Sequence, residues 1–354
     1  MIGLMVEKRE SDLKIIMDKI DIYNFLNKRY SIRNLSDEQF DSIVSELALQ
    51  LESVNFIPKY DEVKLKTDWK KLCDWKNLQD DFINSTSRVG MKLCEHFFPN
   101  FYDIKNNKNV SFSNSWKKEN LEKILKWNRK SHSTPYLSEL KRGIYFCLGL
   151  TKNTMFRPQI AKLICMRYNP KIVFDPCAGW GGRMLGVVSS GANYIAFEPN
   201  NKTYNNLLNL AEFLGIQDKV RIICDDALNM DEYSIPKVDM ILTSPPYFDL
   251  EIYCDERTQS ITNRNSYQEW NDSFLQPLID KSLNYLNKNG YSCWNVGKVN
   301  KNNMFDDVFS AHKNRNFNRV AQFSVTSSKR PQSHRNIKIN KSSDVTEIYK
   351  HEPI

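Results

Sequence analysis

The spacing of hydrophobic and polar positions changes once along the chain, near residue 150. Before that point, apolar residues recur every three to four positions over residues 10–26 and 36–54, the spacing of amphipathic helices. Residues 115–140 add a basic amphipathic segment that is interrupted by a proline. Residues 1–150 are therefore predicted to form a mainly helical region.

Residues 171–300 have a different pattern, in which short apolar runs alternate with longer segments of helical spacing. The strand candidates are KIVFDP, NYIAFEP, VRIICDD, VDMILTS and YSCWNVG. Strands that alternate with helices indicate βαβ units and a parallel sheet. We therefore expect an α/β domain over residues 151–300. Residues 301–354 are polar and basic, and we expect them to complete the sheet with a hairpin and loops.

The composition is typical of a soluble protein in a reducing compartment. The eight cysteines lie at least twelve residues apart, so neither CxxC nor another zinc-ligand spacing occurs. Cys147, Cys165 and Cys224 lie in apolar runs and are expected to be core residues. The first residues lack the layout of a signal peptide, and no apolar run is long enough to span a bilayer. We therefore expect a cytoplasmic or nucleoid-associated protein with no metal site and no membrane partner.

Positive charge is concentrated in two blocks. Residues 105–142 carry ten Lys or Arg against three acidic residues, and residues 308–343 carry eight Lys or Arg and no acid. Two basic blocks on a mildly acidic body indicate contact with a polyanion, although a solvated lysine-rich surface has the same composition. The candidates for nucleic-acid contact are Lys117, Lys118, Lys123, Lys126, Arg129 and Arg330, with Trp116 and Trp127 as candidates for base stacking.

A glycine-rich turn, DPCAGWGGRMLG, follows the first predicted strand. Five of the twelve glycines fall between residues 179 and 191, and this clustering indicates a sharp turn or a close approach of the backbone to a ligand. The turn lies at the carboxyl end of a parallel strand, where α/β sheets bind nucleotide-type ligands. Its spacing is neither GxGxxG nor a P-loop. A strand-to-helix turn with no ligand is the alternative interpretation.

Acidic residues end the next two predicted strands. Glu198 follows Asp175 by 23 positions, and a carboxylate there can accept both hydrogen bonds of a ribose diol. Asp225 and Asp226 end the third strand, where a carboxylate can meet an adenine amino group. Three successive strands that end in acids favour a ligand that contains a nucleoside.

The fourth predicted strand ends in Ser-Pro-Pro-Tyr, residues 244–247. Pro245 and Pro246 have no N–H group and cannot extend a strand, but their restricted backbone can hold a carbonyl oxygen outward. An aromatic amine is a poor nucleophile, and acceptors that are fixed in advance stabilise the positive charge that develops on its nitrogen. A strand-ending turn with a core tyrosine is the alternative interpretation.

Four motifs, in this order, resemble one known family. DPCAGWGGR, AFEP, CDDA and TSPPY are similar to motifs I to IV of the S-adenosylmethionine-dependent amino-methyltransferases, which methylate cytosine N4 or adenine N6 in DNA. The resemblance covers residues 151–300 and implies a Rossmann-like, mostly parallel, seven-stranded sheet with helices on both faces. The upstream segment TMFRPQIAKLIC resembles the element that helps hold the methionine end of the cofactor.

The resemblance also implies roles for individual residues. Ser244 and the backbone carbonyl of Pro245 would hold the amine, Pro246 would stiffen the segment, and Tyr247 would stack on a flipped or single-stranded base. Cys177 stands where the family has an aromatic residue, and Trp180 is the candidate to replace that ring. The residues implied in binding S-adenosylmethionine are Phe156, Arg157, Asp175, Cys177, Gly179, Gly181, Glu198, Asp225 and Asp226.

The target is less narrowly defined than the cofactor. Serine at the first position of the fourth motif resembles the cytosine-N4 branch, so cytosine N4 is favoured over adenine N6. Asp175 and Ser244 are only 69 positions apart, so target recognition is expected from residues 1–150, from the C-terminal segment, or from both. Three alternatives stay open: methylation of an RNA base, methylation of a protein glutamine, and a non-catalytic nucleic-acid-binding subunit.

Overall fold

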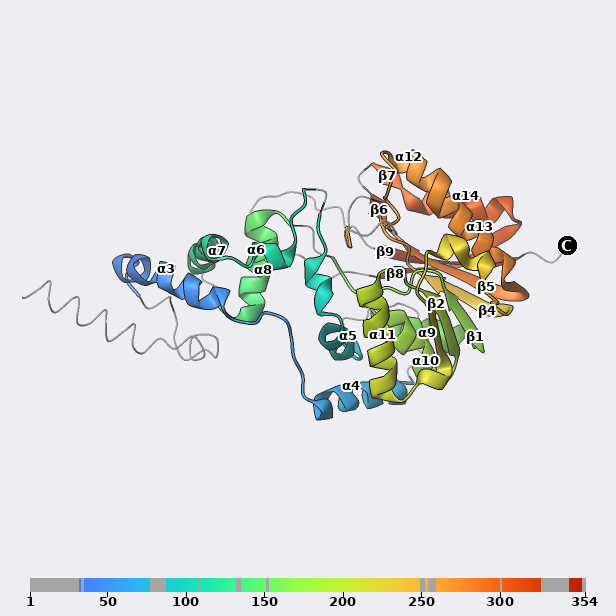
Figure 1. Cartoon of the computed structure of the whole chain (residues 1–354), viewed down its shortest axis with the longest axis horizontal. Coiled ribbons are helices and arrows are strands. Elements are labelled where there is room, and N and C mark those ends of the chain that lie inside the picture. The colour runs from blue at the N-terminus through green and yellow to red at the C-terminus, as the bar shows by residue number, and fades with distance from the viewer. Residues whose placement is uncertain are drawn as a thin grey trace, which may run out of the picture. The chain divides into compact units, whose positions relative to one another are not determined.

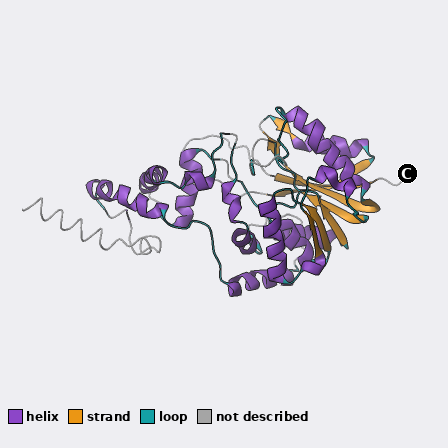
Figure 2. Cartoon of the chain, in the orientation of Figure 1, coloured by secondary structure: helices purple, strands orange, loops and turns teal. Residues whose placement is uncertain are grey.

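The computed structural model describes residues 32, 35–76, 87–106, 108–131, 135–150, 153–248, 252–253, 259–299, 301–325 and 344–351. The chain divides into two compact units, of which the first comprises residues 1–58 and 102–153 and the second residues 59–101 and 154–354. Figure 1 labels the elements of both units. The helices and the strands are coloured separately in Figure 2, where the large sheet belongs to the second unit.

The described part of the first unit is helical. Its helices are α3 (Asp37–Glu52), α6 (Phe112–Ser115), α7 (Lys118–Lys130) and α8 (Leu137–Leu148). A capping box starts α3, in which Ser36 Oγ accepts from the Gln39 N–H (3.2 Å) and Gln39 Oε1 accepts from the Ser36 N–H (2.9 Å). The apolar faces of α3, α7 and α8 share one core. The prediction of a mainly helical N-terminal region is confirmed here, and the helix expected over residues 10–26 lies outside the described residues.

The second unit combines helices with a large sheet. Its helices are α4 (Glu62–Asp74), α5 (Met91–Phe97), α9 (Pro158–Tyr168), α10 (Gly182–Ser189), α11 (Asn201–Leu214), α12 (Tyr267–Trp270), α13 (Gln276–Asn284) and α14 (Met304–Asn314). Its strands are β1 (Ile172–Asp175), β2 (Asn193–Phe197), β3 (Val220–Ile223), β4 (Val238–Thr243), β5 (Leu286–Val296), β6 (Lys298–Val299), β7 (Asn302–Asn303), β8 (Phe317–Val325) and β9 (Asp344–His351). Three 3₁₀ helices are described: η2 (Pro99–Asp103), which spans the boundary between the units, η3 (Gln217–Lys219) and η4 (Ala227–Glu232). The element η5 (Asn271–Leu275) is a short π-helix.

The seven-stranded sheet has the order β3-β2-β1-β4-β5-β9-β8. Strands β1 to β5 are parallel, and β9 runs antiparallel to both of its neighbours. After β1 the chain moves outward through β2 and β3, then returns to β4 and continues on the other side. The order therefore reverses between β1 and β4, and in open α/β sheets a crevice for ligands forms at the carboxyl ends of the strands at such a point. The predicted mostly parallel, seven-stranded sheet is confirmed.

Helices cover both faces of the sheet. Successive strand residues point to opposite faces, so neighbouring residues of one strand pack into different cores. Val173 and Met240 pack into one core with residues of α9, α10 and α11. Their neighbours Phe174 and Ile241 pack into a second core with residues of α12, α13 and α14. The two cores explain why the strand sequences are almost continuously apolar.

Residues 59–101 belong to the unit that holds the sheet, whereas the sequence-based division groups them with residues 1–150. Hydrogen bonds join this segment to two helices of that unit. Lys162 of α9 is buried, and its Nζ donates to the carbonyls of Leu72 (2.6 Å) and Cys73 (2.7 Å) at the end of α4. Asn100 Nδ2 donates to the buried Thr203 Oγ1 of α11 (2.9 Å).

Three local predictions differ from the structure. Residues 304–314 form α14, whereas the sequence predicts only a hairpin and loops in the C-terminal segment. Met304 and Val308 have the four-residue spacing of a helix, but the residues between them are mostly polar, so the helical pattern is weak. Strand β5 begins at Leu286 rather than near Tyr291. Cys224 is exposed, unlike the buried Cys165. Among the helices that the structure describes, none combines the length and the apolar character needed to cross a membrane.

Candidate functional site

The glycine turn connects the end of β1 to the start of α10. Gly181 precedes the helix with φ +73°, a conformation that L side chains rarely adopt. Gly182 is required for a different reason: a Cβ atom there would lie 1.9 Å from the carbonyl oxygen of Phe156. The upstream segment therefore packs directly against the first turn of α10, so Phe156 and Arg157 belong to the same site as the glycines.

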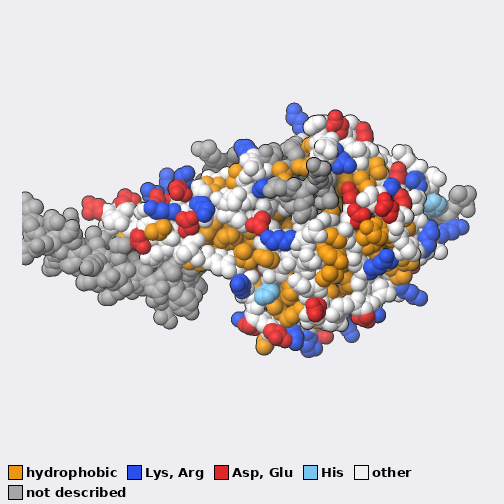
Figure 3. All heavy atoms as spheres, in the orientation of Figure 1, with side chains coloured by type: hydrophobic (Ala, Val, Ile, Leu, Met, Phe, Trp, Pro, Cys, Tyr) orange, Lys and Arg blue, Asp and Glu red, His pale blue; other side chains and the backbone are white. Residues whose placement is uncertain are grey.

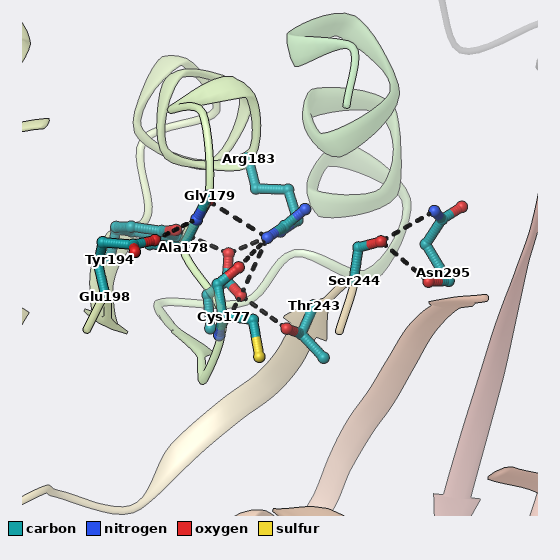
Figure 4. A network of polar contacts seen from close by, with 10 residues as sticks. Cys177, Ala178, Gly179, Arg183, Tyr194, Glu198, Thr243, Ser244 and Asn295 are labelled. Carbon is teal, nitrogen blue, oxygen red and sulfur yellow. Dashed lines mark hydrogen bonds and ion pairs between the residues drawn. The ribbon is translucent and has the colours of Figure 1, made fainter. Parts of the chain in front are cut away.

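Asp175 takes part in a buried hydrogen-bond network, and Figure 4 labels its partners Cys177, Arg183, Tyr194 and Thr243. Its carboxylate accepts from Thr243 Oγ1 (2.7 Å), Tyr194 OH (2.7 Å), Arg183 Nε (2.6 Å) and the Cys177 N–H (3.1 Å). Arg183 also donates to the Cys177 carbonyl. Asp175 is fully buried and its oxygens are engaged by protein donors, so its observed role is to hold the turn and the end of β4 together.

Glu198 follows β2 and faces the glycine turn. Its Oε2 accepts from the Gly179 N–H (3.0 Å) and its Oε1 accepts from the Asn200 N–H (3.0 Å). The side chain is largely buried, and burial raises the pKa of this carboxyl to about 7 despite the two backbone donors. Each oxygen keeps a second lone pair that can accept from a ligand hydroxyl when the group is ionised.

The two acids after β3 have different surroundings. Asp225 accepts from Tyr233 OH (2.8 Å) and Asn229 Nδ2 (3.1 Å), and is thereby held against η4. Asp226 caps η4 by accepting from the Leu228 N–H (3.0 Å) through Oδ1, and its second oxygen has no hydrogen-bond partner among the described residues. Burial raises the pKa of Asp226. In the described part of the chain, no group of three or more His, Cys, Asp or Glu is arranged to hold a metal ion.

Arg157 precedes α9 and is half-buried. Its Nη1 atom is buried without a hydrogen-bond partner, and Arg157 forms no ion pair with any described acid. Burial lowers the pKa of this guanidinium, and the nearby charge of Arg88 acts in the same direction. A buried guanidinium nitrogen without a partner is a group that a ligand carboxylate can satisfy, and the Arg157 backbone directly follows Phe156, which contacts the first turn of α10.

Aromatic rings gather at the glycine turn. Trp180 packs edge-on against Phe98 (6.1 Å between ring centroids) and Phe101 (5.4 Å), and contacts Tyr253 (5.9 Å). Cys177 packs instead against the core that contains α13. Trp180 is the aromatic residue on the turn, and its role as the replacement for the ring missing at Cys177 stays a prediction.

The Ser-Pro-Pro-Tyr segment leaves the sheet directly after Thr243. Pro245 is buried, whereas Ser244, Pro246 and Tyr247 are partly exposed. Ser244 Oγ donates to the backbone carbonyl of Asn295 in β5 (3.0 Å). The segment is therefore attached to β5 at the carboxyl edge of the sheet.

Phe248 ends this segment with φ +40°, a left-handed conformation that is unusual for an aromatic residue. Its ring packs against the rings of Tyr267 (5.9 Å between centroids) and Trp270 (6.0 Å), of which Trp270 is fully buried. Strained backbone persists where surrounding packing enforces it. The chain is thus turned sharply just after Tyr247.

Sequence reasoning missed three residues that organise the site: Arg183, Thr243 and Asn295. Each is a polar residue within an otherwise apolar helix start or strand end, and each is at least nine-tenths buried. Buried polar groups require partners, so their position in apolar runs was the available signal. Their partners lie far away in the sequence and could not be identified from it.

The predicted nucleic-acid residues in the first unit fall into two groups. Lys117 pairs with Glu52 (3.1 Å), and Lys118 lies 3.8 Å from Glu122. Arg129 donates to the carbonyls of Ile32 and Leu35 and pairs with Asp37, so it ties the helices of the unit together. Trp116 is buried, and its indole N–H donates to the Leu51 carbonyl (2.9 Å). These residues have structural partners of their own.

Lys123 and Lys126 form the other group, because both are exposed on α7. On the face shown in Figure 3, Lys and Arg side chains lie interspersed with Asp and Glu side chains rather than in one continuous basic patch. Arg330 lies outside the described residues. Lys123 and Lys126 therefore remain the first candidates for phosphate contacts.

No family model matches the chain, and no curated protein matches its sequence. Solved structures similar to it include TrmN from Thermus thermophilus, with 15% identity and a TM-score of 0.39 over 55% of this chain and 49% of that protein. An S-adenosylmethionine-dependent O-methyltransferase from Thermotoga maritima has 13% identity and a TM-score of 0.39 over 59% of this chain and 71% of its own. A putative RNA methyltransferase from Pyrococcus horikoshii has 14% identity and a TM-score of 0.37 over 58% and 95%. At this level of similarity, the fold assignment rests on the strand order of this chain itself.

Proposed function

We propose that this chain transfers a methyl group from S-adenosylmethionine to an exocyclic amino group of a DNA base, with cytosine N4 favoured over adenine N6. The observation that carries the proposal is the hydrogen bond between Thr243 Oγ1 and Asp175 Oδ1 (2.7 Å). It joins the glycine turn to the start of the Ser-Pro-Pro-Tyr segment at the reversal of strand order, where such sheets bind ligands. A turn suited to the cofactor and a segment suited to an amine thus share one edge of the sheet.

The residues around the glycine turn fit S-adenosylmethionine. The unpartnered Nη1 of Arg157 suits the carboxylate of the methionine part. Glu198 suits the ribose hydroxyls, and the open oxygen of Asp226 suits the adenine amino group. When bound, S-adenosylmethionine supplies a methyl group on a positively charged sulfur, which leaves as a neutral thioether when the amine nitrogen takes the methyl group.

The Ser-Pro-Pro-Tyr segment fits the amine. Ser244 Oγ and the carbonyl of Pro245 would accept the two N–H groups of the amine, and they would stabilise the positive charge that develops on its nitrogen. One of these protons is then lost to solvent. Tyr247 would stack on the base, which must be flipped out of a duplex or already single-stranded. Holding both reactants in line supplies much of the rate.

The exposed charge of α7 supports a nucleic acid as substrate. Lys123 and Lys126 are exposed cations without a described ion-pair partner. Serine at the first position of the Ser-Pro-Pro-Tyr motif favours cytosine over adenine as the target base. The Ser-Pro-Pro-Tyr segment and the cofactor glycines are both intact, and this supports an enzyme over a non-catalytic subunit.

A transfer assay tests the proposal. The purified chain is incubated with methyl-labelled S-adenosylmethionine and, separately, with DNA of mixed sequence, RNA of mixed sequence and a protein mixture. Label is expected in DNA. Label in RNA alone would reassign the substrate to an RNA base, and label in protein alone would reassign it to a side-chain amide. Absence of label in all three would contradict the enzyme.

A further inference from the structure

Asn295 holds the first and last residues of the Ser-Pro-Pro-Tyr segment from the neighbouring strand. Its Nδ2 donates to Ser244 Oγ (3.2 Å) and to Tyr247 OH (3.4 Å), and its backbone carbonyl accepts from Ser244 Oγ (3.0 Å). The Asn295 side chain is largely buried. Because Thr243 pairs with Trp294 between β4 and β5, the strand register brings Ser244 next to Asn295.

These contacts define how the Ser244 hydroxyl can meet a ligand. A hydroxyl has one proton and two lone pairs. The proton is donated to the Asn295 carbonyl, and one lone pair accepts from Asn295 Nδ2. Within the described residues, the second lone pair has no protein partner. Ser244 can therefore accept a hydrogen bond from a ligand but has no proton left to donate to one.

The Asn295 amide is itself oriented from a third strand. Thr346 pairs with Asn295 between β9 and β5, and Thr346 Oγ1 donates to Asn295 Oδ1 (3.1 Å). Thr346 is fully buried. With its oxygen held by Thr346, the amide presents its NH₂ group to Ser244 and Tyr247. Thr346 thus acts on Ser244 without touching it.

We propose that Asn295, oriented by Thr346, is a positioning residue that makes Ser244 an obligate hydrogen-bond acceptor and so selects bases with an amino group over bases with a carbonyl at the same position. The inference rests on the proposed function, in which Ser244 meets the exocyclic amine. A carbonyl oxygen opposite Ser244 would leave two acceptors facing each other without a proton between them, which is unfavourable in a partly buried site.

A binding measurement tests this without requiring turnover. The probes are short single-stranded runs of thymidine with one central base, compared as two pairs: deoxycytidine against deoxyuridine, and deoxyadenosine against deoxyinosine. Each pair exchanges an amino group for a carbonyl. Binding is measured in the presence of S-adenosylhomocysteine. The wild type is expected to bind the amino member of at least one pair about tenfold more tightly than its carbonyl partner.

Variants then assign that preference to the proposed network. Asn295→Ala and Thr346→Val should each reduce the preference, and Asn295→Ala should reduce it no further in a Ser244→Ala background, because residues that act as one unit are not additive. Ser282→Ala is the matched control, since it removes a fully buried hydroxyl that bonds the Leu278 carbonyl in α13 and should leave the preference unchanged.

The outcomes separate the two proposals. A wild type without preference, or variants that keep the full preference, would overturn the role of Asn295 even if methyl transfer occurs. Additive losses in the double variant would also overturn it, because they would indicate a structural effect independent of Ser244. A preference that depends on Asn295 together with no methyl transfer to any polymer would retain the binding role and reject the enzyme.

Discussion

Asp175 accepts a 2.7 Å hydrogen bond from Thr243 at the point where the strand order of the sheet reverses. Both residues are fully buried. The same carboxylate oxygen accepts from the Cys177 N–H of the glycine turn (3.1 Å). One buried acid therefore links the turn proposed for the cofactor to the strand that carries the segment proposed for the amine.

Replacing this acid should destabilise the second unit strongly. Asp175→Asn would leave the Arg183 guanidinium buried without its counter-charge, and breaking a buried ion pair in this way costs about 3–5 kcal/mol. The free energy of unfolding is measured by urea denaturation. The control is Asp280→Asn, because Asp280 and Arg315 form an exposed pair that should contribute less than about 1 kcal/mol. Equal losses in the two variants would contradict the role of Asp175.

Cofactor binding should depend on pH through Glu198. Burial raises its pKa to about 7, and the ionised carboxylate is the form that accepts both ribose hydroxyls. Binding favours ionisation and releases a proton, so the affinity should rise as the pH increases through about 7 and level off above it. The raised pKa of Asp226 acts in the same direction.

Calorimetric titration with S-adenosylhomocysteine between about pH 5.5 and 8.5 measures this dependence. The variant Glu198→Gln cannot ionise at this position and should bind weakly with a flatter pH profile. A wild-type affinity that does not change across this range would show that Glu198 does not meet the ribose.

The Ser-Pro-Pro-Tyr segment should affect methyl transfer and not cofactor binding. Pro245→Ala frees the backbone that holds the carbonyl, and Tyr247→Ala removes the stacking ring. Each is expected to lower kcat by about a hundredfold, as for the loss of one fixed group that stabilises a transition state, while the Kd for the cofactor is unchanged. Parallel losses of both would indicate that the segment supports the cofactor turn instead.

Exposed lysines of α7 should contribute to nucleic-acid affinity through charge. The double variant Lys123→Glu, Lys126→Glu should weaken binding to DNA and reduce the salt dependence of the binding constant, by about 0.9 in log–log slope for each phosphate that the variant no longer neutralises. Lys219→Glu is the control, because Lys219 is exposed at the amino end of β3, away from the carboxyl ends of the strands. If the double variant and Lys219→Glu show the same salt dependence of DNA binding, α7 is not a surface that binds DNA.

The sequence predicted local features of the second unit better than its long-range contacts. The apolar runs at 172–175, 193–197 and 238–243 form strands as expected, because continuous burial on both faces requires such runs. The polar surface of α14 concealed its apolar stripe. The contacts of Ser244 with Asn295 and of Asp175 with Thr243 join positions far apart in the chain, and only the strand register reveals them. The roles of the site residues toward ligands stay predictions.

The position of the transferred methyl group tests the central claim most directly. Polymer methylated by the wild type is digested to nucleosides, and the products are separated and identified by mass spectrometry against standards. We predict N4-methylcytosine, formed by the wild type and strongly reduced in Tyr247→Ala. N6-methyladenine would change the favoured base but keep the exocyclic amine as acceptor. A methyl group on a ring carbon, a ring nitrogen or a sugar oxygen would contradict the account.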